Sequence, residues 1–248
     1  MFERAELIVP ADGQPVRVAW LPDGRTRLVY SAIEGYEYGD LRIAGPQSRA
    51  LYKSVARVRW SLVLPFRPGW SSASLGVPSH ELRDRFLPLE DLWGRAARDL
   101  GYELAATPDA GGARPVLARL TPLLEARARA TDELASARLA RLAVRVMEEG
   151  DARMAHVADR LGVTSRHLRR AFTESVGVGP KDFARAIRLQ RAVRSAATSR
   201  DWARIAAENG YCDQAHLIDD FRALVGLTPG AYFDDRIARP GEADCVAS

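Results

Sequence analysis

Several features that would identify a secreted, membrane-spanning or metal-binding protein are missing from this sequence. Its 248 residues include only two cysteines, Cys212 and Cys245, which is too few for a disulfide framework and favours a reduced chain. No stretch reaches the roughly 20 apolar residues needed to cross a bilayer. The N-terminus carries charges without the apolar run of a secretory signal. We therefore expect a cytoplasmic protein with no membrane contact.

Histidine is also scarce, and its spacing argues against a metal site. His80 is the only histidine in the first half of the chain, and none of the four occurs in an HxH, HExxH or CxxC context. The sequence contains no GxSxG, P-loop or GxGxxG motif. We therefore expect no metal, no cofactor and no catalytic residues. The four histidines are His80, His156, His167 and His216.

The sequence does contain an internal repeat, in which one pattern occurs twice. VADRLGVTSRHLRRAF followed by VGVGPKDF spans residues 157–183, and IAAENGYCDQAHLIDDF followed by VGLTPGAY spans residues 205–232. From Leu168 onward, matching positions recur 49 residues later, whereas those before the turn recur 48 residues later. The second copy therefore has one extra residue in its turn. Each copy predicts a short helix, a turn and a longer helix, a helix-turn-helix whose second helix enters the DNA major groove.

The charge is distributed unevenly over the two copies. The chain as a whole carries a modest net charge of +4. Residues 153–194 contain ten basic and three acidic residues, a balance of +7, whereas residues 195–235 contain three basic and seven acidic residues, a balance of −4. A basic block on a helix-turn-helix is the expected electrostatic footprint of phosphate binding. The alternative is an arginine-rich solvated face.

The longer helix of the first copy predicts a DNA-reading face. We expect Gly162 to end the short helix in the left-handed conformation and Thr164 to cap the longer one. Arginine can bond both O6 and N7 of guanine, and each such pair discriminates by about 1–3 kcal/mol. For any one arginine, the alternative is a contact with phosphate alone. The candidate DNA contacts on this helix are Ser165, Arg166, Arg169, Arg170 and Thr173.

The second copy keeps the inward positions and changes the outer face. Gln214 can pair with adenine and Ala215 can touch a thymine methyl group. Asp219 and Asp220 are also expected on the outer face, where they would usually repel the DNA backbone. We therefore predict a weaker DNA contact from this module. Its candidate contacts are Gln214, Ala215, His216 and Asp219.

One long helix is predicted between the copies, over residues 181–197. Its length would let it space the two modules rigidly. Arginines line several of its sides, and Arg188 is the candidate for a phosphate contact.

The first part of the chain is predicted to be β-rich. Short segments of β-branched and aromatic residues between turn-forming glycines and prolines favour a small antiparallel barrel or sandwich. Residues 66–82 are interpreted as a loop plus a strand, and residues 89–100 as a helix with one apolar face. The predicted strands lie in residues 16–21, 26–33, 36–44 and 55–64.

These elements predict a two-domain α+β protein. Residues 1–130 form a β-rich sensor or oligomerisation domain with a connecting helix, residues 131–235 form an all-α tandem helix-turn-helix domain, and residues 236–248 form a flexible tail. The boundary region is residues 107–115, followed by helical runs over 116–130 and 132–149.

Six aromatic residues of the first domain are candidates for an effector pocket. The alternative is that they are ordinary core and rim aromatics. They are Trp20, Tyr30, Tyr36, Tyr38, Trp60 and Trp70.

The double motif resembles the AraC/XylS family of bacterial transcription regulators. The resemblance covers Asp151 to Phe233 and includes LGVTSRHLRRAF, GVGPKDFARAIRLQRA and GYCDQAHLIDDFRALVGLTPGAYF. It implies two recognition helices in successive major-groove segments on one face of the DNA. Asp219 departs from the family pattern, which usually has a basic residue there. The base-reading candidates that the resemblance implies are Arg166, Arg169, Arg170, Gln214, Ala215 and Asp219.

The N-terminal sequence resembles a cupin-like sensor domain found before such DNA-binding domains. The segments that carry the resemblance are WLPDGRTRLVY, GDLRIAGPQSRAL and FRPGWSSASLGVPSHELRDRFLPLEDLWG. Metal-binding cupins use several histidines and a carboxylate, whereas only His80 is present here. The resemblance therefore implies a sensor, and it argues against a metal-dependent enzyme.

Together these observations predict a sequence-specific transcription regulator. Double-stranded DNA is the expected partner, and a small-molecule effector, a contact with RNA polymerase and a homodimer are left open. One alternative is a non-specific architectural DNA-binding protein, which the acidic second module argues against. The other alternative is a small-molecule enzyme in the N-terminal barrel, for which the sequence offers no catalytic motif.

Overall fold

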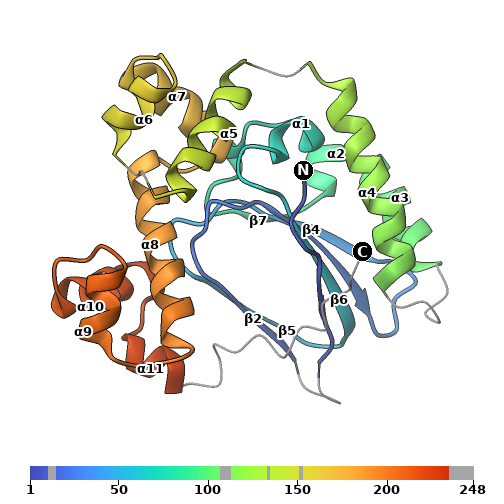
Figure 1. Cartoon of the computed structure of the whole chain (residues 1–248). Helices are drawn as coiled ribbons and strands as arrows, with labels where there is room; N and C mark the ends of the chain where they lie inside the picture. The colour runs from blue at the N-terminus through green and yellow to red at the C-terminus, as the bar shows by residue number, and fades with distance from the viewer. Residues whose placement is uncertain (11–14, 107–112, 133–134, 151–152, 235–248) are drawn as a thin grey trace.

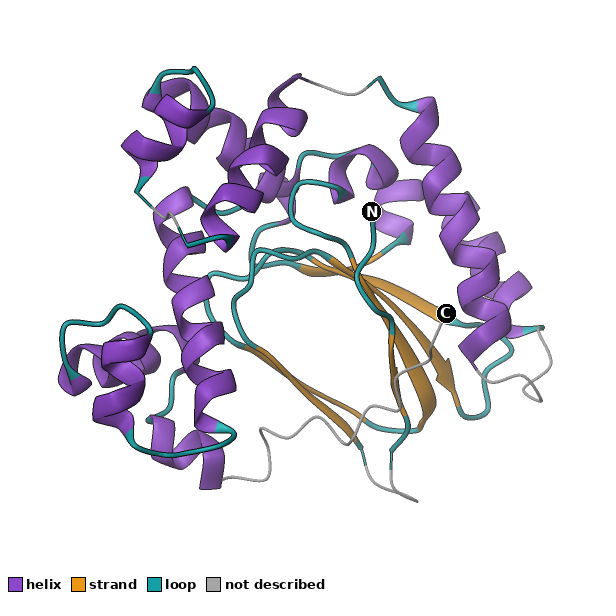
Figure 2. Cartoon of the chain, viewed as in Figure 1, coloured by secondary structure: helices purple, strands orange, loops and turns teal. Residues whose placement is uncertain are grey.

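The chain forms a β-rich N-terminal region followed by a region built from helices (Figures 1 and 2). The computed structural model describes residues 1–10, 15–106, 113–132, 135–150 and 153–234. Within these residues the strands are β1 (Glu6–Ile8), β2 (Val16–Trp20), β3 (Arg27–Ile33), β4 (Asp40–Ala44), β5 (Leu51–Val55), β6 (Val58–Pro65) and β7 (Phe86–Pro88). The N-terminal region also holds α1 (Ser71–Leu75), the 3-10 helix η1 (Ser79–Leu82), α2 (Glu90–Trp93), α3 (Arg95–Ala105) and α4 (Ala113–Ala130). The helices that follow are α5 (Ala135–Glu148), α6 (Met154–Arg160), α7 (Ser165–Val176), α8 (Pro180–Ala196), α9 (Trp202–Glu208), α10 (Gln214–Val225) and α11 (Pro229–Asp234).

The strands form two antiparallel sheets. The larger sheet has the order β1-β6-β3-β4-β7, and β2 pairs with β5 in a separate ribbon. Because successive side chains on a strand point to opposite faces, β3 contributes side chains to two apolar clusters, one on each face of the sheet. Leu28 and Tyr30 pack on the helical side, whereas Val29 packs with Val18 and Trp20 of the β2 strand. The alternation therefore places the larger sheet between helices and the two-stranded ribbon.

Helices α3 and α4 cover the outer face of the larger sheet, and α1 packs against α4 (Figure 1). Leu100 and Leu104 from α3 and Val116, Leu120 and Leu124 from α4 are all buried against the sheet's apolar residues. These side chains belong to the largest apolar cluster among the described residues. No helix in the described ranges is long and apolar enough to span a membrane.

The helical region carries the predicted pair of helix-turn-helix modules. The first module combines α6 and α7, and the second combines α9 and α10, with α8 running between them (Figure 1). Helix α5 packs along α7, and Phe172 and Phe183 meet edge to face with ring centroids 5.3 Å apart. The expected fold class, a β-rich N-terminal region followed by a tandem helix-turn-helix, is confirmed.

The prediction of a strand within residues 66–82 is wrong, because this segment forms α1 and η1. The buried face of this segment includes serines, so the sequence shows no apolar helical pattern. Ser71 and Ser79 share a hydrogen bond of 3.0 Å, and Ser74 donates to the carbonyl of Leu124 at 3.1 Å. The single helix expected over residues 89–100 is interrupted by Gly94, whose φ of 56° ends α2 before α3 begins.

The strands β1, β5 and β7 were not predicted. Strands β1 and β7 are three residues long and lie at the edges of the larger sheet, so neither shows a full alternation. Strand β5 pairs only with β2 and leaves most of its side chains partly or fully exposed, which removes the apolar signal. The segment expected as a strand over 36–44 is shorter, because β4 begins at Asp40.

The predicted domain boundary near residue 130 stays a prediction. Residues 107–112 of the boundary segment and the expected tail, 236–248, lie outside the described residues. The apolar clusters do change there: Leu124 belongs to the cluster under the larger sheet, whereas Ala140 belongs to the cluster around α7.

The β-rich region contacts the C-terminal ends of both longer module helices. At the end of α7, a Cβ on Gly177 would lie 2.7 Å from the carbonyl oxygen of Ser79 and 2.6 Å from Pro46. At the end of α10, the carbonyls of Leu224 and Val225 accept hydrogen bonds from the Ala50 N–H at 2.7 Å and from the Tyr52 hydroxyl at 2.9 Å. The N-terminal region therefore packs directly on both modules.

A matched pair of glycines tests this packing. Gly177 and Gly226 end α7 and α10 with φ values of 87° and 80°, so alanine at either position adds left-handed strain of about 1–2 kcal/mol. A Cβ on Gly226 meets nothing within 4 Å, whereas one on Gly177 meets the Ser79 backbone. We expect Gly177→Ala to lower the free energy of unfolding in urea by about 1–3 kcal/mol more than Gly226→Ala. Equal losses would contradict the close contact.

Candidate nucleic-acid interface

The turns of the two modules are built by the same backbone device. Gly162 and Gly210 adopt left-handed φ values of 66° and 75°. After each glycine, the next residue donates its N–H back into the short helix: Val163 to Ala158 and Tyr211 to Ala206, both at 3.0 Å. The left-handed turn predicted at Gly162 is confirmed, and the second copy repeats it.

Each recognition helix begins with a side-chain cap. Thr164 Oγ1 accepts a hydrogen bond from the His167 N–H at 3.2 Å, as predicted from the sequence. At the equivalent place in the second module, Asp213 Oδ1 accepts from the His216 N–H at 2.7 Å. Each cap satisfies one of the N–H groups that a helix leaves unpaired in its first turn, so both helices present ordered N-termini.

The outer face of α7 is basic. Leu168 and Phe172 are fully buried, which turns the opposite side of the helix outward. Arg166, Arg169 and Arg170 lie on that exposed side. The two remaining candidate contacts on this helix, Ser165 and Thr173, are half-buried.

The outer face of α10 is mixed. Gln214, Ala215 and Asp219 are exposed, as their candidate role requires. His216 is half-buried, because its ring packs edge to face against Tyr211 with centroids 5.4 Å apart. Its Nδ1 also accepts from the Cys212 N–H at 3.4 Å. Contact of these four residues with DNA stays a prediction.

The expectation that Asp220 lies on the outer face is wrong. Asp220 is only 6% exposed and accepts a hydrogen bond from Arg185 Nε of α8 at 2.8 Å. One carboxylate and one guanidinium are therefore paired between α10 and α8 and do not face DNA as independent charges. The acidic surface of the second module is smaller than its sequence indicates.

Arg188 also has a place within the protein. Its guanidinium lies 5.2 Å from the ring centroid of Tyr211 and donates to the carbonyl of Gly210 at 3.5 Å. Burial, followed by the nearby carboxylate of Asp220, raises the pKa of the Tyr211 hydroxyl. The contact of Arg188 with phosphate stays a prediction, and its position shows that it also supports the turn of the second module.

Two surface residues were missed from the sequence. Arg222 is exposed on α10, and the 49-residue repeat places it at the position of Thr173, which was a signal that could have found it. His80 lies in η1, which packs against α7, and it borders the same concavity as Arg166 and Arg169. No sequence signal connects His80 to a helix that begins 85 positions later.

The six aromatic candidates for an effector pocket are dispersed over the N-terminal region. Trp20 is buried with the Arg27 guanidinium 5.3 Å from its ring centroid, and Tyr30 packs against Trp60 at 5.2 Å. Tyr36 is 61% exposed, and Tyr38 packs edge to face against Tyr102. Trp20 belongs to a different apolar cluster from Tyr30 and Trp60, and the role of these five residues in effector binding stays a prediction.

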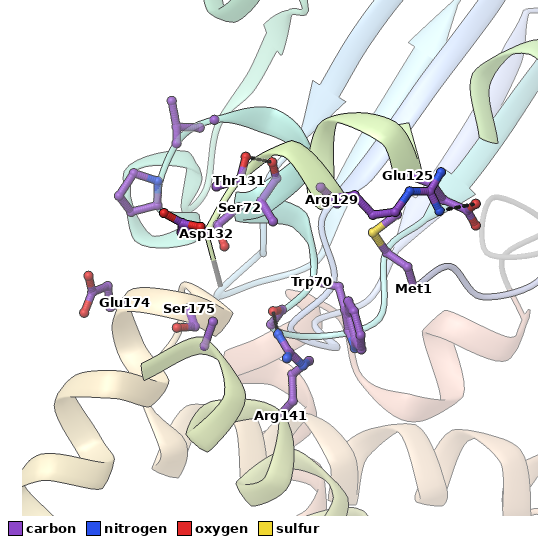
Figure 3. Close-up of a pocket in the computed structure, with 17 residues that line it drawn as sticks. Met1, Trp70, Ser72, Glu125, Arg129, Thr131, Asp132, Arg141, Glu174 and Ser175 are labelled. Carbon is purple, nitrogen blue, oxygen red and sulfur yellow. Dashed lines mark hydrogen bonds and ion pairs between the residues drawn. The ribbon is translucent and has the colours of Figure 1, made fainter. Parts of the chain in front are cut away.

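The sixth aromatic residue, Trp70, lines a cavity of about 480 Å³ (Figure 3). The cavity lies where α1 and α4 meet α5 and α7, and its walls are mostly apolar. The guanidinium of Arg141 lies 4.0 Å from the centroid of the Trp70 ring, and burial lowers the pKa of that guanidinium. Glu174 and Ser175 of α7 form the opposite side. The cavity therefore joins the N-terminal region to a recognition helix.

Among the described residues, no group of three or more histidine, cysteine, aspartate or glutamate side chains could hold a metal ion.

Residues 157–235 match a family model described as a helix-turn-helix domain, which is of the AraC type. No curated protein matches the sequence. Crystal structures of ToxT from Vibrio cholerae show a distant likeness. An apo ToxT variant is 15% identical, covers 94% of this chain and 93% of that chain, and has a TM-score of 0.43. A further ToxT structure is 12% identical, with coverage of 94% and 98% and a TM-score of 0.45. ToxT with a bound unsaturated fatty acid is also 12% identical, with coverage of 93% and 94% and a TM-score of 0.43.

The two neighbouring aspartates of α10 give a matched test of the buried pair. Asp220→Ala leaves the Arg185 guanidinium without its carboxylate, and we expect the free energy of unfolding to fall by about 2–3 kcal/mol, less than for a fully buried pair because Arg185 is 30% exposed. Asp219→Ala removes an exposed carboxylate and should change stability by less than about 0.5 kcal/mol. Urea unfolding monitored by circular dichroism measures both values. Similar values for the two variants would contradict the assignment.

Proposed function

We propose that this protein, whose residues 157–235 match a helix-turn-helix family model of the AraC type, is a sequence-specific transcription regulator that places two recognition helices in successive major grooves. The observation that carries the proposal is the repeated module: both copies have the same glycine turn and the same side-chain cap. Each copy also turns one face of its longer helix outward. A helix presented in this way is the element that reads base edges in the major groove.

The first module is proposed to anchor the protein on DNA. Three exposed arginines of α7 supply both phosphate contacts and the bidentate geometry that guanine requires. The outer face of α10 carries Asp219 beside Arg222, which gives it little net charge. We therefore propose that α10 tunes or extends the contact.

The cavity beside Trp70 is proposed as the effector site. Its mostly apolar walls favour a small molecule with an apolar body. Because Glu174 and Ser175 belong to α7, a ligand there would contact the N-terminal region and the first recognition helix at once. A contact with RNA polymerase and a homodimer stay predictions.

DNA recognition is tested by replacing one arginine of α7. We expect Arg169→Ala to weaken binding to a duplex selected from a random pool by about 1–3 kcal/mol and to affect a random duplex less. The control is Arg95→Ala on α3, whose side chain is 89% exposed and lies on another part of the molecule. Fluorescence anisotropy at several salt concentrations gives the binding constants. A wild-type log K that does not fall with log [salt] would contradict DNA binding.

The proposed effector site is tested with an apolar fluorescent probe, anilinonaphthalene sulfonate. Ala128 lines the cavity, so Ala128→Phe should fill part of it and reduce the fluorescence enhancement of the bound probe several-fold. Ala126 of the same helix is exposed and does not line the cavity, so Ala126→Phe should leave the enhancement unchanged. Equal responses of the two variants would place the probe elsewhere.

A further inference from the structure

The DNA-reading face of α7 is bordered by the N-terminal region. Helix η1 packs against α7, and Ser79 approaches the C-terminal end of α7 so closely that only glycine fits at residue 177. His80, the next residue, is exposed and borders a shallow concavity of about 570 Å³ together with residues of the outer face of α7. The residues that line it are His80, Arg166, Arg169, Arg170, Thr173 and Glu174.

The concavity is strongly biased toward positive charge. Its lining residues include three arginines and one histidine against a single acidic residue, Glu174. Glu174 is half-buried and also lines the cavity beside Trp70. A surface of this kind attracts an anion, and the planar guanidinium groups match the oxygen geometry of a phosphate.

The dimensions of DNA indicate which part of it would reach His80. An α-helix with its side chains is about 10–12 Å across, and the major groove of B-DNA is about 12 Å wide. A recognition helix therefore fills the groove, and a group that stands beside the helix meets the sugar-phosphate backbone at the groove edge. His80 stands beside α7 on a different element, so with α7 in the groove it would meet phosphate and not base edges.

We propose that His80 is a DNA-contacting residue of the N-terminal region, which binds a backbone phosphate at the edge of the groove that α7 occupies. The inference rests on the proposed function, because it requires α7 to enter the major groove. The imidazole N–H donates to a phosphate oxygen, and Arg169 and Arg170 line the same concavity. The β-rich region then contributes directly to the DNA interface, in addition to packing on the two modules.

The test uses the full chain and two substitutions at one position. Ser79 contacts α7, so a change at residue 80 could also disturb packing; the pair His80→Ala and His80→Lys separates the two effects, because lysine restores a phosphate donor. We expect His80→Ala to weaken binding to selected and random duplexes alike, about three- to tenfold. His80→Lys should bind at least as tightly as the wild type. The matched control is Arg85→Ala, an exposed cation of the same region that does not line the concavity.

Each outcome has a defined meaning. If the wild type and Arg169→Ala behave as expected for a DNA-binding protein and His80→Ala binds like the wild type, the proposed function stands and this inference is wrong. If His80→Ala and His80→Lys both lose affinity, the role of His80 is structural and the inference is overturned. Equal losses for His80→Ala and Arg85→Ala would also overturn it, since they would indicate general attraction. If inorganic phosphate shifts the His80 ring signals in NMR while DNA affinity is insensitive to His80→Ala, the site binds free phosphate instead.

Discussion

The packing of the β-rich region on the C-terminal ends of α7 and α10 is the constraint on which the arrangement of the molecule depends. The last carbonyls of a helix have no partner within it, and at α10 two of them accept hydrogen bonds from Ala50 and Tyr52. At α7 the same region comes so close that Gly177 leaves no room for a side chain. The capped N-terminal ends of both helices are left exposed, at Thr164 and Asp213.

The ion pair between Arg185 and Asp220 changes how the charge of the two modules is understood. In the sequence, one residue belongs to a basic block and the other to an acidic block. In the structure they neutralise each other between α8 and α10. The electrostatic contrast between the modules therefore comes from the exposed side chains, the three arginines of α7 against Asp219 and Arg222 of α10, whose charges offset each other. The contrast remains, but it is smaller than the difference between the two block charges.

The repeat made the helical region predictable, because turns, caps and inward positions are local and occur twice. Even the burial of Asp220 could have been predicted, since the 49-residue offset places it at the inward position of Ala171. The N-terminal region was harder. The buried serines of α1 carry no apolar periodicity, and β5 lacks a second neighbour that would bury it. The meeting of His80 with α7 could not be predicted at all, because it depends on how distant parts of the chain pack.

The contact between the second module and the β-rich region has a thermal consequence. Leu21 packs with Leu189 and Leu224, and this contact is mainly apolar. Hydrophobic association is driven by entropy near room temperature and weakens on cooling. The two hydrogen bonds at the end of α10 contribute about 0.5–1.5 kcal/mol each and do not share this temperature dependence. The apolar part of the contact that holds α10 against the β-rich region therefore weakens in the cold.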